Sequence, residues 1–330
     1  NDSGTVYKLT SSGVESVIYA FAGGTKDGDS PYGGLIEAPD GYLYGTTAFG
    51  GLIGPDGAGN GTIYKISKDG AESVIYFFSG NTPDGGHPGG KLLLGNDGNF
   101  YGATTFSIHG PKQGTIFKTS STGVTTTFYT FAVSNDGNSP NGSLINNNNS
   151  LYGTTKFGGS NNDGIVFSLS SSGIESIIYS FTGINGSNPS AGLIMAKDGN
   201  FYGTTQYGGS KNDGVVFSIN KSGIESVIYT FTGNDGRLPV TALIQAADGN
   251  LYGTTYYGGN SDIGEVFKVT PAGILSVIYS FSGSDGSNPQ SDLLEANDGY
   301  IYGTTAEGGA YGYGTIFRIK EKVESIVAAF

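Results

Sequence analysis

The feature that most constrains the fold of this chain is a five-residue motif, Leu-Tyr-Gly-Thr-Thr, which recurs at a nearly constant interval. The tyrosines of six copies fall at positions 44, 101, 152, 202, 252 and 302, so the steps between them are 57, 51, 50, 50 and 50 residues. The copies are Leu43–Thr47, Phe100–Thr104, Leu151–Thr155, Phe201–Thr205, Leu251–Thr255 and Ile301–Thr305. A fixed period of about this length means that one supersecondary unit is repeated along the chain.

Each unit contains four short runs with the character of β-strands. In the run Glu15–Phe21, which is copied as far as Glu324–Phe330, large apolar residues occupy alternate positions, the two-residue period of a strand. A further run is the short Gly34–Ala38 type, and another is the Leu-Tyr-Gly-Thr-Thr run itself. The remaining type is found at Thr5–Leu9, Thr62–Ile66, Thr115–Thr119, Ile165–Leu169, Val215–Ile219, Glu265–Val269 and Thr315–Ile319.

Turn sequences between these runs predict antiparallel hairpins. Asp-Gly precedes most Leu-Tyr-Gly-Thr-Thr copies, as at Asp40-Gly41 and Asp198-Gly199, and predicts a tight turn in which both residues have positive φ. Asn147–Asn149 takes this place in the third unit, because asparagine tolerates the same backbone region. No stretch shows a sustained 3.6-residue apolar period, so almost no helix is expected.

Units of about 50 residues with four antiparallel strands are typical of kelch-like β-propeller blades. The Thr5–Leu9 and Glu15–Phe21 types occur seven times and the other two types six times, which makes six full repeats plus half a repeat. We therefore expect an all-β chain with a single propeller domain over residues 1–330. Seven blades, one of them incomplete, are favoured, and six blades are the alternative.

The motif set resembles the GloVer tandem repeat over essentially the whole chain. The motifs that carry the resemblance are Gly-Thr-Val/Ile-Phe/Tyr-Lys, Ser-Gly-x-Glu-Ser-Val-Ile-Tyr-x-Phe, Asp-Gly-x-x-Pro and Leu-Tyr-Gly-Thr-Thr. The resemblance implies a secreted or surface-anchored bacterial protein. It implies no particular activity and transfers no catalytic residue.

Composition narrows the classes of partner. With 16 basic and 28 acidic residues the formal net charge is −12, which disfavours nucleic acid and anionic membranes. No apolar run reaches the length of a membrane span. The chain has no cysteine, which excludes disulfides and thiolate metal sites. The start at Asn1 has no basic-then-apolar pattern, so we expect any signal peptide to be absent or removed. The secreted or cell-surface location that we expect is what the resemblance implies.

The two longer connections of each unit are expected on one face of the propeller, because alternate connections of an antiparallel meander lie at opposite ends. Function tends to reside on such long loops. Aromatic rings beside Asn, Asp and Gly suit sugar binding, since they combine a stacking plane with fixed hydrogen-bonding groups. The candidate ligand-binding residues are Phe49, Phe157, Tyr207, Tyr257, Asp163, Asp213 and Asp262. The opposing interpretation is that these rings pack between blades.

Repetition of these loops favours a non-enzymatic binding or adhesion protein that recognises glycan or protein ligands. The alternative is a polysaccharide-acting hydrolase or lyase that uses loop carboxylates on the same face, such as Asp163, Asp213 and Asp235. No catalytic constellation is recognisable, so no catalytic residue is assigned.

No cofactor is predicted, and the oligomeric state is left open. Calcium is the cation that the Asn- and Asp-rich loops could suit. The only two histidines, His87 and His109, are candidate metal ligands, but a zinc site needs three or four ligands. The preferred interpretation is that both are ordinary surface residues.

Overall fold

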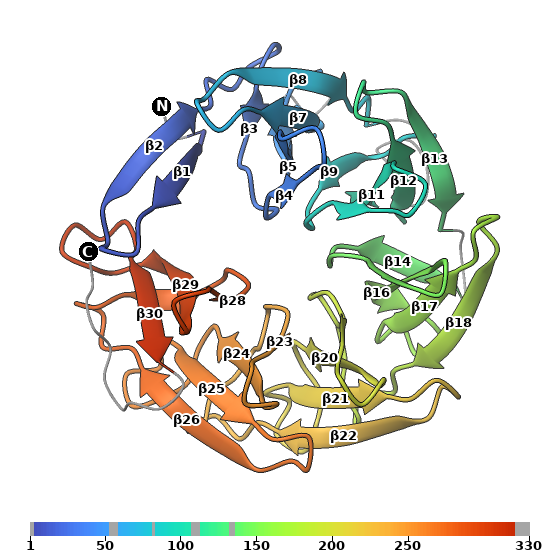
Figure 1. The fold of residues 1–330 in the computed structure, drawn as a ribbon. Coiled ribbons are helices and arrows are strands. Elements are labelled where there is room, and N and C mark those ends of the chain that lie inside the picture. The colour runs from blue at the N-terminus through green and yellow to red at the C-terminus, as the bar shows by residue number, and fades with distance from the viewer. Residues whose placement is uncertain (1–2, 53–58, 81–82, 107–112, 132–135, 321–330) are drawn as a thin grey trace. The chain divides into compact units, whose positions relative to one another are not determined.

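The computed structural model describes residues 3–52, 59–80, 83–106, 113–131 and 136–320. These residues form strands, turns and loops, and they include no α-helix (Figure 1). Within this described part, no helix is therefore long and apolar enough to span a membrane. The all-β prediction is confirmed.

The strands are organised as the blades of a β-propeller, with four antiparallel strands in sequence order in the first five blades and three described strands in the sixth. The first three blades are β4(Ile36–Glu37), β5(Leu43–Thr47), β7(Thr62–Ile66), β8(Glu72–Phe77); β10(Leu93–Leu94), β11(Phe100–Phe106), β12(Thr115–Thr119), β13(Thr125–Thr130); and β15(Ile145–Asn147), β16(Ser150–Gly158), β17(Ile165–Leu169), β18(Glu175–Ser180). The next three are β19(Ile194–Met195), β20(Phe201–Thr205), β21(Val215–Ile219), β22(Glu225–Thr230); β23(Ile244–Gln245), β24(Leu251–Thr255), β25(Glu265–Val269), β26(Leu275–Ser280); and β28(Leu294–Glu295), β29(Tyr300–Glu307), β30(Ile316–Lys320).

The favoured count of seven blades is wrong, and the described residues form six, the stated alternative. The N-terminal strands β1(Thr5–Leu9) and β2(Glu15–Ala20) pair only with each other among the described strands, so they make a two-stranded hairpin. The physical reason is that neither strand pairs with a Leu-Tyr-Gly-Thr-Thr strand among the described residues, so no sheet extends the hairpin into a blade. The last predicted strand, Glu324–Phe330, lies outside the described residues.

Contacts group the chain into two compact units. The first comprises Asn1–Gly159 and Ile165–Ile178, and the second comprises Ser160–Gly164 and Tyr179–Phe330. Each unit is described by itself below. A single domain over residues 1–330 stays a prediction.

Aromatic rings fill the space between neighbouring blades within each unit. Between the first two blades, the Tyr44 and Phe100 rings stack with centroids 4.3 Å apart. Phe78 meets Phe117 edge to face at 5.1 Å, and both are fully buried. Buried aromatic pairs of this kind add to the stabilisation from area alone. The alternating apolar positions of the sequence thus become the inter-blade core.

The glycine of Leu-Tyr-Gly-Thr-Thr leaves room for the aromatic side chain of the neighbouring strand. A Cβ atom added to Gly203 would lie 2.6 Å from the Phe217 ring and 3.1 Å from Leu193. The same close approach recurs in the other blades, for example between Gly153 and Phe167. A larger residue would overpack this site.

The tyrosine of the motif is held by the aspartate of the preceding Asp-Gly turn. Tyr202 Oη donates a hydrogen bond to Asp198 Oδ2 at 2.8 Å, and Tyr44 Oη donates to Asp40 Oδ2 at 2.6 Å. The predicted turn type needs correction, because Gly41 has a positive φ (83°) and Asp40 does not. The aspartate instead accepts backbone and tyrosine donors, which favours the ordinary φ region for it. Asn148 and Asn149 do adopt positive φ, as predicted.

Candidate functional site

The two long connections around a blade pair with each other, as expected for loops that share one face. In the first unit, β3(Gly28–Asp29) pairs with β6(Phe49–Gly50), and β14(Gly137–Pro140) pairs with β16. In the second unit, Ser187 and Tyr207 form an isolated bridge, as do Arg237 and Tyr257. Two short loop strands are β9(Gly86–Pro88) and β27(Ser287–Pro289). The long-loop face is therefore a set of small, backbone-paired platforms.

The four predicted stacking rings lie on these platforms and are all partly exposed. Phe49 meets the His87 ring edge to face at 4.6 Å, and Lys156 Nζ lies 5.6 Å from the Phe157 ring centroid. The Arg237 guanidinium covers the Tyr257 ring at 4.6 Å. These rings are neither core residues nor bare stacking planes. Their role in ligand binding stays a prediction.

The predicted acceptors Asp163, Asp213 and Asp262 are not equivalent. Asp262 Oδ1 accepts the Gly258 backbone N–H at 3.0 Å, which is the role of Asn212 toward Gly208 in the preceding blade. Asp262 also forms an ion pair with Arg237 (Nη2–Oδ2 2.6 Å), which lowers the pKa of its carboxyl.

Asp163 and Asp213 occupy a different position of the loop, one residue before the glycine that leads into the third strand, where the next blade has Ile263. Asp163 Oδ1 accepts the Ser187 hydroxyl at 2.6 Å. Asp235, the further loop acid of the enzyme alternative, accepts the Tyr229 hydroxyl and the Thr232 backbone N–H (2.8 Å). Asp163 therefore links its loop to the connection that contains Ser187, whereas Asp235 forms hydrogen bonds with its own loop and the strand before it.

The metal candidates do not come together in the described part of the chain. His87 lies in β9 with φ of 54°, against Phe49. His109 lies outside the described residues. The described residues contain no cluster of three or more His, Asp or Glu side chains that could hold a metal ion.

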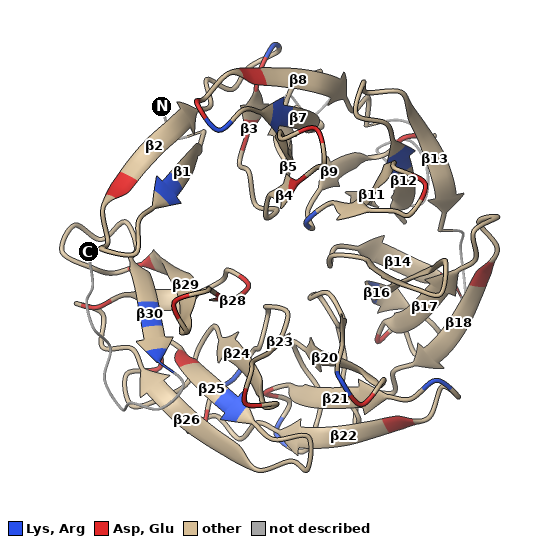
Figure 2. Cartoon of the chain, in the orientation of Figure 1, with Lys and Arg blue, Asp and Glu red and all other residues tan. Residues whose placement is uncertain are grey.

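Basic residues recur at one position of the third strand or its counterpart in the hairpin. Figure 2 shows these positions on separate strands, β1, β7, β12, β25 and β30. Lys118 Nζ is paired with Asp97 Oδ2 at 2.7 Å, and Lys65 Nζ lies 5.0 Å from the Tyr42 ring. Lys118 and Lys65 thus make contacts within their own sheets.

A set of three polar side chains that sequence reasoning missed recurs between successive sheets. We call it a junction set: the tyrosine of an outermost strand, the Asp or Asn of the following Asp-Gly-x-x-Pro connection, and the glutamate that begins the next sheet's outermost strand. Tyr129 Oη donates to Asp136 Oδ2 at 3.0 Å, beside Glu175 of β18. Tyr19 Oη donates to Asp27 Oδ2 at 3.1 Å, beside Glu72 of β8.

In the folded chain, the ionised form of the junction glutamates Glu72 and Glu175 is unfavourable. Burial, and then the charge of Asp27, raises the pKa of Glu72 to about 7, against the pull of its hydrogen bond with Tyr19. Burial and the charge of Asp136 raise the pKa of Glu175 to about 7. One oxygen of each glutamate, Oε1, is buried without a hydrogen-bond partner among the described atoms. A second negative charge is therefore costly at this position.

One junction in the second unit has Asn185 in place of the aspartate. Tyr179 Oη donates to Glu225 Oε2 at 3.3 Å, and the Asn185 amide donates to the same oxygen at 3.3 Å. Burial raises the pKa of Glu225, and no aspartate contributes to the shift. Asn is thus compatible with the junction geometry.

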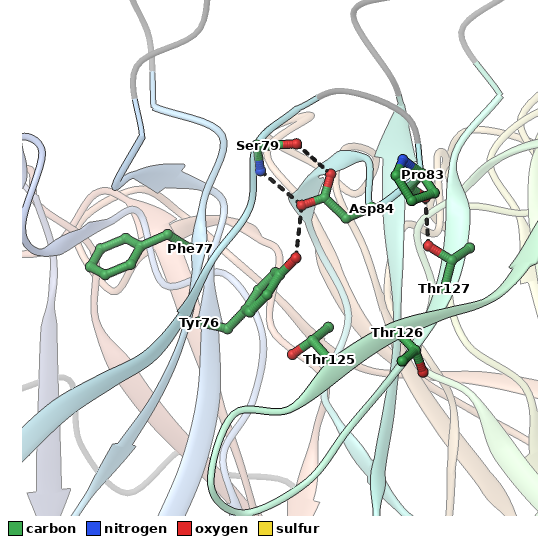
Figure 3. A pocket seen from close by; sticks show the side chains of 8 residues that line it. All are labelled: Tyr76, Phe77, Ser79, Pro83, Asp84, Thr125, Thr126 and Thr127. Carbon is green, nitrogen blue, oxygen red and sulfur yellow. Dashed lines mark hydrogen bonds between the residues drawn. The ribbon is translucent and has the colours of Figure 1, made fainter.

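The junction between the first and second blades lacks the glutamate. Thr125 begins β13 as Glu72 begins β8 and Glu175 begins β18. Its hydroxyl bonds within its own hairpin, to Thr119 Oγ1 at 2.8 Å. An open groove of about 630 Å³ lies beside it (Figure 3). The groove is lined by Tyr76, Phe77, Ser79, Pro83, Asp84, Thr125, Thr126 and Thr127.

The remaining two members of this junction are in place at the groove. Tyr76 Oη and the Ser79 backbone N–H both donate to Asp84 Oδ2 at 2.9 Å, and Ser79 Oγ donates to Asp84 Oδ1 at 2.6 Å (Figure 3). Burial, and then the bond and charge of Asp84, raise the pKa of Tyr76, so its hydroxyl remains a donor. The groove therefore presents a fixed carboxylate, a phenol and threonine side chains.

A second junction that lacks the glutamate shows a different replacement. Leu275 begins β26 next to the Tyr229 and Asp235 pair. It is partly buried against the apolar core of the fourth and fifth blades. A leucine fills volume that threonine leaves free, so the groove follows from the small polar residue at position 125.

The sequence pattern of the Gloeobacter/Verrucomicrobia repeat matches residues 1–197, 52–249 and 194–330, which together span the chain. No curated protein matches the chain in sequence. The fold is similar to a streptogramin B lyase structure (TM-score 0.62, 17% identity, 91% of this chain and 82% of that chain).

Two putative 6-phosphogluconolactonases are similar as well. The one from Bacteroides uniformis ATCC 8492 has a TM-score of 0.64 at 14% identity, over 98% of this chain and 89% of that chain. The one from Bacteroides fragilis NCTC 9343 has a TM-score of 0.63 at 15% identity, over 100% of this chain and 90% of that chain. At such identities the likeness shows the fold alone.

Proposed function

The chain belongs to the Gloeobacter/Verrucomicrobia repeat family, and we propose that it is a non-enzymatic protein that binds glycans in the groove beside Thr125. The observation that carries the proposal is the groove itself, where the repeat departs from its own pattern. A carboxylate, a phenol and several hydroxyls around one concavity are the groups that orient a sugar. Secretion or display at the cell surface, where such glycans occur, is part of the proposal.

The groove supports binding more than catalysis. A glycoside hydrolase needs two carboxyl groups that flank the scissile bond, and the described lining of the groove contains one, that of Asp84. The junctions that do have paired carboxyls, such as Asp136 with Glu175, bury them partly between strands. The solved lyase and lactonase structures share the fold, which hosts many functions.

Thr125→Glu tests this proposal by restoring the glutamate of the repeat. We expect the variant to fold normally, because the other junctions already accommodate this side chain beside Tyr and Asp. The new side chain should fill the groove and abolish glycan binding measured on an oligosaccharide array. Thr122→Glu is the matched control, since it adds the same side chain at an exposed turn residue of the same hairpin and should bind normally.

The same oligosaccharide array distinguishes glycan binding in the groove from glycan binding on the long-loop rings. The triple variant Phe157→Ala, Tyr207→Ala and Tyr257→Ala removes three of the predicted stacking planes and leaves the groove intact. Glycan binding that survives in Thr125→Glu but disappears in the triple variant would place the site on the loops and refute the groove. Binding of protein ligands alone would refute the glycan assignment.

A further inference from the structure

We propose that the groove beside Thr125 binds the primary ammonium group of an amino sugar, held between the Asp84 carboxylate and the Tyr76 hydroxyl oxygen. This inference rests on the proposed function, because it names the ligand chemistry of the same groove. The ammonium group would occupy the place that the junction glutamate takes elsewhere in the chain.

The two acceptors are preorganised and retain hydrogen-bonding capacity. From described donors, Asp84 Oδ2 accepts two hydrogen bonds, whereas Oδ1 accepts one, from Ser79 Oγ. A carboxylate oxygen has two lone pairs, so Oδ1 can accept another donor. The Tyr76 oxygen donates its proton to Asp84 and can accept one in return. In the second unit, the amide of Asn185 donates to Tyr179 Oη in just this way.

The charge of the groove selects a cation over an anion. Among the described residues that line it, Asp84 is the one charged residue, and none is Lys or Arg. Glutamates at the equivalent positions of two other junctions have pKa values raised to about 7, because burial and a neighbouring aspartate resist a second negative charge. The negative charge of Asp84 attracts a cation, whereas burial opposes a charge of either sign. Hydrogen bonds from a cationic donor to a carboxylate are also stronger than neutral ones.

The rest of the groove favours a sugar as the carrier of the ammonium group. Thr126 and Thr127 line it together with the Tyr76 ring, and Thr126 is exposed. Hydroxyls and an aromatic edge match the polyol and apolar faces of a pyranose. A volume of about 630 Å³ exceeds what a single lysine side chain would occupy. An oligomer of β-linked glucosamine has the required chemistry.

Calorimetric titration with the glucosamine tetramer and with its fully N-acetylated form tests the inference. We expect the free amine to bind about 10- to 100-fold more tightly, the equivalent of a charge-assisted hydrogen bond. Asp84→Asn should bring the two affinities to within about threefold of each other. This variant should fold, because Asn185 shows that an amide fits the same junction position.

Two results would overturn the inference. One is equal affinity of the wild-type protein for the amine and its acetylated form. The other is binding of a lysine tetrapeptide as tightly as the glucosamine tetramer, which would show that the groove recognises an ammonium group without a sugar. If Thr125→Glu abolishes glycan binding but the amine is not preferred, this inference fails and the proposed function stands. If Thr125→Glu leaves glycan binding intact, both fail.

Discussion

Phe217→Ala is expected to lower the free energy of unfolding by about 3–5 kcal/mol, the usual cost of removing a buried phenylalanine. Phe217 is fully buried, meets the Phe181 ring edge to face at 5.0 Å, and covers Gly203 in the middle of the fourth blade. Truncation would leave a cavity between rigid strands that cannot close it. Urea denaturation followed by circular dichroism measures the change.

Tyr207→Ala in the same blade is the control for Phe217→Ala. The Tyr207 ring is partly exposed, while its backbone pairs with Ser187, so the substitution keeps the loop contact. Its cost should be about 1 kcal/mol or less, as for other surface substitutions. A larger loss from Tyr207→Ala than from Phe217→Ala would mean that the ring is core, and the assignment of Tyr207 to the long-loop face would be wrong.

The stability of the protein is expected to fall as the pH rises from about 5 to about 8, because of Glu72 and Glu175. Both carboxyls have pKa values near 7 in the folded chain, against an ordinary value of 4.5. Below pH 4.5 they are protonated in both states, so ionisation does not affect folding. Above that pH the unfolded chain ionises first, and near pH 7 the folded chain must carry the unfavourable charges.

A shift of this size corresponds to about 3 kcal/mol for each group, and partial solvent exposure reduces it to about 1–2 kcal/mol. The double variant Glu72→Gln and Glu175→Gln should lack the loss of stability that these two groups cause between about pH 5 and about pH 8. Thermal unfolding of wild type and variant at several pH values measures the difference. Glu225→Gln is the control, and its effect should be smaller because Asn185 replaces the aspartate there. Identical pH profiles for the wild type and the double variant would contradict the assignment.

The strands could be predicted from the sequence because their determinants are local. The bounds of β5 and β7 agree with the predicted runs, since a two-residue apolar period and the neighbouring turns decide where a strand begins and ends. The blade count could not be predicted in the same way. It depends on what β1 and β2 pair with, and a single half repeat beside six full ones leaves that question open.

The candidate site was less accessible to sequence reasoning, for two reasons. Residue type alone places Asp262 with Asp163 and Asp213. Its hydrogen bond with the Gly258 backbone N–H shows that it instead occupies the loop position of Asn212. The second reason is that the groove exists because Thr125 replaces a glutamate side chain. Thr125 and Tyr76 belong to different repeats and meet only when two blades pack. The signal was present in the alignment of repeats, where Thr125 stands in the column of the junction glutamates.

The central claim is that the binding site exists because Thr125 replaces the junction glutamate. The most direct test is to remove the glutamate from a second junction. Glu175→Thr should open an equivalent groove beside the hydrogen-bonded pair Tyr129 and Asp136, while the native groove remains. Calorimetric titration with the glucosamine tetramer should then give two ligands per chain, against one for the wild type and none for Thr125→Glu. A stoichiometry that stays at one in folded Glu175→Thr, or a ligand that still binds folded Thr125→Glu, would contradict the claim.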